Sequence, residues 1–294
     1  MKKENGILTQ VTDKDIDHLI FMPKDFWKDV TIIGKDAFKD CQRLTSLEIP
    51  NTVQDIDANA FNNCTNLTNI TLPENLTRIS SFTFSDCKSL TEIIIPESVT
   101  SIGAYAFYNC NALSSVNLSD SVTKIERCAF YNCSSLTEFN FPNQLTELGE
   151  KAFSNCKLLK IIQLPNGLEN VKSRTFSSCE SLEQVNLSEV KEIGESAFFN
   201  CTSLTDIELP SSLETIDEFA FGNCYSLKEI VIPNKIRYIR LGTFQNCLDL
   251  QNVKISQETR IEVKRETFKN CKQLKIEYYK GETPKQQEQE NEKE

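Results

Sequence analysis

The feature that most constrains this chain is a line of about 23 residues that recurs along most of its length. The stretch SVTSIGAYAFYNCNALSSVNL, residues 98–118, is followed by the similar stretch SVTKIERCAFYNCSSLTEFNF, residues 121–141. A unit of this size cannot bury its apolar face alone, so the repetition predicts a solenoid in which successive units stack. Eleven cysteines mark the period, each with a Phe three residues before it and a Leu three residues after it: Cys41, Cys64, Cys87, Cys110, Cys133, Cys156, Cys179, Cys201, Cys224, Cys247 and Cys271.

The spacing within one unit predicts its local structure. In AFYNCNAL, residues 106–113, apolar side chains fall at i, i+1, i+4 and i+7, which indicates one face of a short helical turn. Val116 and Leu118 then alternate inward as in an extended segment, and a Pro or Ser ends this segment in most units. The sequence therefore predicts an α/β repeat solenoid of the leucine-rich type. It is expected to be a right-handed superhelix with short parallel strands on the concave face and short helical turns on the other side.

The periodic cysteines are expected to be free and buried. Equivalent positions on stacked coils lie near the strand spacing of about 4.8 Å, but their Cβ vectors run parallel, which disfavours disulfides. Free Cys commonly packs as a small hydrophobe. The chain contains no C-x-x-C motif, and parallel thiols do not converge on a tetrahedral centre, so no metal site is predicted.

Cys128, the twelfth cysteine, lies in a column that is otherwise polar or variable. Two interpretations are open: a surface cysteine without a role, and an exposed thiol that acts as the nucleophile of an enzyme. The nucleophile interpretation requires a lowered thiol pKa, and the sequence shows no His or helix start near Cys128 that would lower it. His18 is the only histidine, and motifs for phosphate, dinucleotide, zinc or calcium sites are missing from the sequence. We therefore expect a protein that is not an enzyme and uses no cofactor.

The net charge of the chain is -10 and its pI is about 4.9. Such an acidic chain repels phosphate backbones and anionic lipid surfaces, so no nucleic acid partner is expected. No stretch approaches the roughly 20 apolar residues of a membrane span, which argues against membrane insertion. The first residues lack the apolar run of a signal peptide. These features predict a cytoplasmic location, with the cell surface or secretion by an unrecognised route as the alternative.

The two ends of the chain depart from the period. Residues 1–29 are predicted to form a degenerate N-terminal cap with Phe26 and Trp27 as cap material, because terminal units of solenoids are usually atypical. Residues 30–280 form about eleven repeat units, and the alternation in LKIEYYKG near their end predicts a closing strand. Residues 281–294 are rich in Glu and Gln and are predicted to be a disordered acidic tail.

Strand residues that point away from the core should line the concave face, where stacked repeats offer an extended surface. Two outward columns, from Ser46 to Asn252 and from Glu48 to Lys254, hold six acidic side chains and one basic side chain. This face therefore suits a protein partner with a basic segment; the sequence does not indicate an oligomeric state. The predicted partner-binding residues are Glu92, Asn117, Glu138, Asn140, Gln163, Asn186, Asp206 and Glu208. The four amides among them either contact a peptide backbone or form a ladder in which they bond one another.

The pattern LxxIxIPxxVxxIGxxAFxxCxxL is carried intact by residues 90–113. Here the chain resembles the BspA-like leucine-rich repeats, also called the Treponema pallidum type, and the resemblance covers about residues 30–280. It implies a repeat fold that serves as a binding scaffold, and many members are surface or secreted proteins that bind host proteins or other cells. The function expected is a non-catalytic leucine-rich repeat scaffold that binds a protein partner on its concave face. The alternative is a surface or secreted adhesin that binds proteins of a host or of neighbouring cells.

Overall fold

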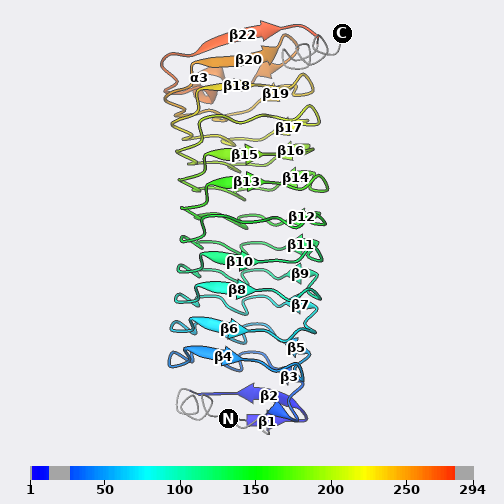
Figure 1. Cartoon of the computed structure of the whole chain (residues 1–294). Coiled ribbons are helices and arrows are strands. Elements are labelled where there is room, and N and C mark those ends of the chain that lie inside the picture. Colours follow the sequence, from blue (N-terminus) through cyan, green and yellow to red (C-terminus); the bar gives the residue numbers. More distant parts are fainter. Residues whose placement is uncertain (1, 13–26, 282–294) are drawn as a thin grey trace. The chain divides into compact units, whose positions relative to one another are not determined.

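The computed structural model describes residues 2–12 and 27–281. The chain divides into two compact units, residues 1–159 and residues 160–294, and each unit is a stack of short β-coils (Figure 1). The repeat solenoid predicted from the sequence is thus confirmed in each unit. Three predicted features lie outside the described residues: Phe26, His18 and the acidic tail from residue 282.

In the first unit most coils carry two short strands, one on each of two sides (Figure 1). The parallel pairs β4–β6 and β8–β10 form the first column, from strands β4 (Ser46–Glu48), β6 (Asn69–Thr71), β8 (Glu92–Ile94) and β10 (Ser115–Asn117). The second column is also parallel and contains β3 (Ile32–Ile33), β5 (Asp55–Ile56), β7 (Arg78–Ile79), β9 (Ser101–Ile102), β11 (Lys124–Ile125) and β12 (Glu147–Leu148). An antiparallel hairpin of β1 (Lys2–Glu4) and β2 (Ile7–Gln10) pairs onto β3.

The second unit repeats this arrangement. Its first column contains β13 (Ile161–Gln163), β15 (Gln184–Asn186), β18 (Glu229–Val231), β20 (Asn252–Ser256) and β22 (Lys275–Tyr279). Its second column contains β14 (Asn170–Val171), β16 (Glu192–Ile193), β17 (Thr215–Ile216), β19 (Tyr238–Ile239) and β21 (Arg260–Ile261). The predicted closing strand is confirmed as β22, which pairs in parallel with β20.

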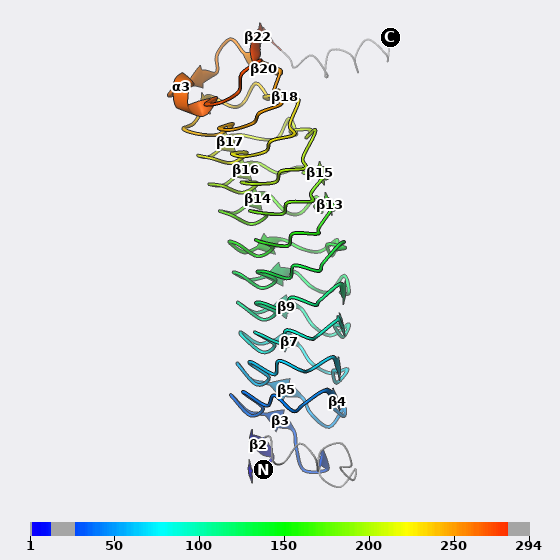
Figure 2. The ribbon, with the colours of Figure 1, turned by 90° about the vertical axis from the view of Figure 1, so that its left-hand side faces the viewer.

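The third side of each coil is formed by hydrogen-bonded turns, and the predicted short helical turns are wrong. The only helix that lies wholly within the described residues is α3 (Lys264–Thr267), at one corner of the second unit (Figure 2). In a typical coil, the N–H groups of Tyr105, Phe107 and Asn109 donate to carbonyl oxygens of the next coil over 2.8–3.0 Å. Only the N–H groups between them donate within the coil, three residues back. A helix would need every N–H for its own i−4 carbonyl, so the ladder between coils excludes it.

Left-handed backbone conformations recur every four residues in these turns. Tyr105 has φ 59° and Asn109 has φ 57°, and the same two positions are left-handed in most other coils. Asn and Asp tolerate this region better than most residues, and one of them directly precedes the Cys in ten of the eleven units. Their side chains bond from coil to coil, for example from Asn109 Nδ2 to Asp86 Oδ1 at 3.0 Å and from Asn132 Nδ2 to Asn109 Oδ1 at 2.9 Å.

Columns of apolar side chains fill the interior of each unit. The periodic Phe rings from Phe38 to Phe244 are fully buried and stack on one another, with centroids 4.8–5.5 Å apart in the first unit and 5.6–5.7 Å apart from Phe176 onward. The periodic Leu side chains beside them are also buried, except at the last coil. Burying each such side chain stabilises the fold by about 1.5–3 kcal/mol. The side chains of one isolated coil cannot offset the conformational entropy that is lost when its chain is ordered.

The predicted burial of the periodic cysteines is confirmed for all but Cys271, which is half-buried, and all twelve cysteines are free. Nine of the periodic thiols donate to the carbonyl of the Phe in the preceding coil, as Cys110 Sγ does to Phe84 O at 3.1 Å. Cys41 Sγ in the first complete unit donates to Val11 O at 3.5 Å. The column therefore needs a side chain that is small, apolar and able to donate one weak hydrogen bond, which is what a thiol provides.

Cys128 is also buried, with 3% of its surface exposed. Both sequence-based interpretations placed this residue at the surface, and both are wrong in that respect. It occupies the left-handed turn position, with φ 54°, next to the aromatic side chains of the turn side. Burial, and then the interaction with Cys128, raises the pKa of Tyr105. The tyrosine therefore lies against Cys128 and limits its access to solvent.

Candidate binding surface

The strand face of each unit is the surface made by the outward residues of its first strand column. Alternation along an extended segment sends every second side chain to the core, so the residues between them face solvent. The burial pattern of β8, exposed–buried–exposed, shows this directly, because Ile93 is buried while Glu92 and Ile94 are exposed. All eight predicted partner-binding residues are exposed: Glu92, Asn117, Glu138, Asn140, Gln163, Asn186, Asp206 and Glu208.

In the first unit the structure brings two of the four predicted residues onto one sheet. Glu92 in β8 is in register with Ser115, and Asn117 in β10 is in register with Ile94. Glu138 and Asn140 are exposed on the next coil, but residues 136–142 form no strand.

Two aromatic residues distinguish this coil from the others. Most other coils carry an aliphatic side chain at the positions of Phe139 and Phe141. Phe139 lies edge-on to Phe153, with ring centroids 4.6 Å apart, and Phe141 lies edge-on to the same ring at 5.3 Å. The two rings are larger than the aliphatic side chains at these positions in most other coils, and the coil that holds them forms no strand over residues 136–142.

In the second unit the predicted residues form a continuous group. Gln163 in β13 pairs in register with Asn186 in β15, and Asn186 pairs with Glu208 through an isolated parallel bridge. Asp206 lies two residues before Glu208 and is exposed on the same face.

The amides of the strand face form no ladder within either unit, which contradicts that alternative. Asn186 Oδ1 accepts the N–H of Ser188 at 2.8 Å, so it is used within its own turn. No hydrogen bond joins the side chains of Gln163 and Asn186, or those of Asn117 and Asn140, although all four lie among the described residues. The amide ladder of this protein is instead the column that precedes the cysteines. The sequence signal of this ladder is the Asn or Asp that directly precedes the Cys in ten of the eleven units.

A hollow of about 550 Å³ opens in the strand face of the second unit. It lies between the coil of β15, the coil with residues 206–211, and the coil of β18. The ladder is open here, because Asn186 bridges to Glu208 while no strand pairing joins Glu208 to β18. Its polar lining includes Asn186, Asp206, Glu208 and Glu229, and no Lys, Arg or His belongs to the lining. Glu229 is therefore a candidate that the eight predicted residues omitted.

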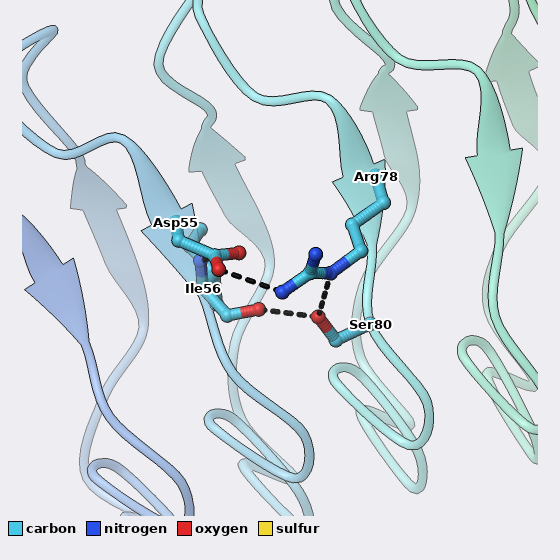
Figure 3. A network of polar contacts seen from close by, with 4 residues as sticks. All are labelled: Asp55, Ile56, Arg78 and Ser80. Carbon is cyan, nitrogen blue, oxygen red and sulfur yellow. Dashed lines mark hydrogen bonds and ion pairs between the residues drawn. The ribbon is translucent and has the colours of Figure 1, made fainter.

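Several charged residues away from the strand face form ion pairs with one another. Figure 3 shows one such network on the second strand column: Arg78 Nη2 lies 2.7 Å from Asp55 Oδ2, and Ser80 Oγ donates to Ile56 O at 2.6 Å. The hydrogen bond that Lys124 donates to Glu147 likewise raises the pKa of Lys124. These pairs neutralise charges of the second column between neighbouring coils of the first unit.

The strand face differs in this respect. Glu92, Glu138, Asp206 and Glu229 form no ion pair with any residue in 2–12 or 27–281. Side chains of this kind retain their full charge for a partner, because no cation of the protein competes for them.

Metal sites and membrane-spanning helices are both absent from the part of the chain that the structure describes. There, no group of three or more His, Cys, Asp or Glu residues is placed to hold a metal ion. No described helix has both the length and the apolar content needed to cross a membrane.

Comparison with known protein families identifies the family of this chain. The family described as a BspA-type leucine-rich repeat region of six copies matches residues 31–160 and again residues 158–275. The chain belongs to the BspA-type leucine-rich repeat family. The resemblance inferred from residues 90–113 is thereby confirmed, and the periodic Phe, Cys and Leu columns are the core of BspA-type units in this chain.

Solved structures of other leucine-rich repeat proteins resemble this BspA-type chain. A leucine-rich cell surface protein from Faecalibacterium prausnitzii is 29% identical, with 85% of this chain and 83% of that chain covered and a TM-score of 0.48. A leucine-rich repeat protein from Eubacterium ventriosum is 22% identical, with 74% and 81% covered and a TM-score of 0.51. The pneumococcal vaccine antigen PcpA is 21% identical, with 85% and 79% covered and a TM-score of 0.50. The Eubacterium ventriosum protein and PcpA have the same fold as this chain. A comparison with curated proteins gave no match.

Proposed function

We propose that this BspA-type protein is a non-catalytic scaffold that binds a protein partner through its strand face. The observation that carries the proposal is the contrast in charge pairing. In the second strand column of the first unit, the carboxylates of Asp55 and Glu147 are engaged by neighbouring cations. On the strand face, Glu92, Glu138, Asp206 and Glu229 are exposed and form no ion pair among the described residues. Unpaired charge of one sign on an extended face speeds encounter and selects a partner of the opposite sign.

The geometry of the face fits a protein better than a small molecule. Most of the surface is a series of exposed side chains on stacked strands, and extended surfaces of this kind are what solenoid proteins use for binding. The acidic balance, with a net charge of -10, favours a partner with a basic segment and disfavours nucleic acid.

Charge reversal on the strand face should abolish partner binding. We expect Glu92→Lys with Glu138→Lys to reduce capture of partners from an extract of the source cells at least tenfold, because like charges across an interface cost several kcal/mol. Captured proteins are quantified by mass spectrometry. The matched control is Glu97→Lys with Glu150→Lys, which makes the same charge change at exposed residues outside the strand face and should reduce capture less than twofold.

Both pairs of changes are at exposed residues, so the circular dichroism spectrum and the melting temperature should match those of the wild type. Equal capture by the strand-face pair and the wild type would place the binding site elsewhere and refute the proposal.

A further inference from the structure

The hollow in the strand face of the second unit differs from the rest of that face in shape and in charge. It has a volume of about 550 Å³, within the range of roughly 300–1,000 Å³ that ligand pockets occupy. Asp206, Glu208 and Glu229 lie on its lining together with the amide of Asn186. We propose that this hollow, which we call the acidic groove, receives an arginine side chain of the protein partner. The inference rests on the proposed function and assigns the chemistry recognised at one part of the same face.

The spacing of the carboxylates suits a guanidinium group. Asp206 and Glu229 occupy equivalent positions of consecutive coils on the two sides of the opening in the ladder, so their backbones lie at least the strand spacing of about 4.8 Å apart. Asp206 and Glu208 lie two residues apart along one extended segment, or roughly 6.6 Å. A planar group with five N–H donors spans such distances and bonds two carboxylates at once.

The other residues of the acidic groove suit the aliphatic part of an arginine. Val231 is half-buried, and Pro210 and Pro233 also lie on the lining. Long cationic side chains lay their methylene stems along apolar surface of this kind while the charged end reaches polar groups.

The electrostatics favour a cation. No basic side chain belongs to the lining, and neither Asp206 nor Glu229 is ion-paired to any described residue. A cation that enters therefore displaces no internal partner of these two carboxylates. Lysine is the weaker ligand, because its ammonium is a compact and strongly hydrated charge that cannot bridge two separated carboxylates in one plane.

Lys254 restricts which part of the partner segment can lie next to β20. It pairs in register with Val231, one coil beyond the acidic groove, and is the one basic residue of the two outward columns. A second cation of the partner is repelled on that side, so the segment that carries the arginine is expected to be neutral or acidic toward β20.

The test uses the full chain and a fluorescein-labelled nonapeptide in which Ser and Arg alternate, with fluorescence anisotropy as the readout. Two analogues replace each Arg by Lys or by uncharged citrulline. We expect the Arg peptide to bind, the Lys peptide to bind at least fivefold more weakly, and the citrulline peptide not to bind. Equal affinity for the Arg and Lys peptides would overturn the proposal, because it would show attraction to net charge alone.

The matched variants separate the acidic groove from the acidity of the whole chain. Asp206→Asn with Glu229→Gln should weaken binding of the Arg peptide at least tenfold. Glu192→Gln with Glu218→Gln removes the same charge at exposed residues of the same unit outside the acidic groove and should weaken it less than twofold. Equal weakening by the two pairs would overturn the proposal.

Failure of this inference is distinguishable from failure of the proposed function. If the Arg peptide does not bind while Glu92→Lys with Glu138→Lys still abolishes partner capture, the assignment of the acidic groove is wrong and the strand face remains the binding surface. If neither strand-face variant affects capture, the proposed function itself is refuted.

Discussion

Raising the pH from 8 to about 10.5 should unfold the first unit of this protein, because its core contains a column of acids that must stay protonated. Burial raises the pKa of the Cys87, Cys110 and Cys133 thiols well above their usual range, and it raises that of Cys156 as well. In the unfolded chain these thiols ionise at about 8.5. Above that pH the unfolded state releases protons that the folded state keeps, so the free energy of unfolding falls as the pH rises.

The size of the effect follows from the number of thiols. Each raised thiol lowers the free energy of unfolding by about 1.4 kcal/mol per pH unit between its unfolded and its folded pKa. For four such thiols the slope is about 5 kcal/mol per pH unit, comparable to the 5–15 kcal/mol that stabilises a typical domain. The second unit has three further fully buried thiols with raised pKa and the half-buried Cys271, whose pKa is raised to about 11. It should therefore respond in the same way.

The measurement is urea unfolding followed by circular dichroism at a series of pH values from 7 to 10.5. Cys110→Ala is the control, because it removes one titrating group and should reduce the pH slope by about 1.4 kcal/mol per pH unit. It also corrects for ionising Tyr and Lys residues, which both proteins share. An unchanged slope in Cys110→Ala would show that the thiols do not cause the alkaline unfolding.

Truncating one ring of the Phe column should be the most destabilising single substitution. Phe107 has no exposed surface and lies between two other rings, with centroids 5.4 Å from Phe84 and 5.1 Å from Phe130. Phe107→Ala is expected to lower the free energy of unfolding by about 3–5 kcal/mol, because it removes buried apolar area and leaves a cavity between coils that are held at fixed spacing. Urea unfolding at neutral pH measures the change.

Phe82→Ala is the matched control for Phe107→Ala. Phe82 also stacks on a ring of the next coil, with its centroid 4.6 Å from that of Tyr105, but 36% of its surface is exposed. We expect a loss of about 1–2 kcal/mol, since part of the ring remains in contact with water and no closed cavity forms. Equal losses for the two substitutions would show that the Phe column does not form a continuous core.

The interior of this fold was predictable from the sequence, because eleven repetitions identify each column independently of any single unit. The turn side was not. In residues 106–113 an apolar pattern at i, i+1, i+4 and i+7 fits a helical turn, but it fits a series of left-handed turns equally well. The two structures differ in which carbonyl group accepts the hydrogen bond of each N–H. The sequence indicates this only indirectly, through the Asn or Asp that precedes the Cys in ten of the eleven units.

The candidate site was predictable residue by residue but not in its shape. Alternation along the strands identified outward residues such as Glu92 and Asn186, and both are exposed. The acidic groove depends on where the ladder between coils is open, and no local pattern in the segment from Asp206 to Glu208 marks that opening. The burial of Cys128 was missed for a similar reason, because the neighbouring coil contributes Tyr105 beside it.

Reaction of native protein with a thiol-specific chromophoric reagent at pH 8 tests most directly whether the coils stack around a dry interior. Eleven of the twelve thiols, Cys128 included, are buried, and only Cys271 is half-buried. At most one thiol per chain should therefore react in the native protein, and all twelve should react after denaturation in guanidinium. Rapid reaction of several thiols in the native protein would contradict the stacked arrangement on which the strand face and its acidic groove both depend.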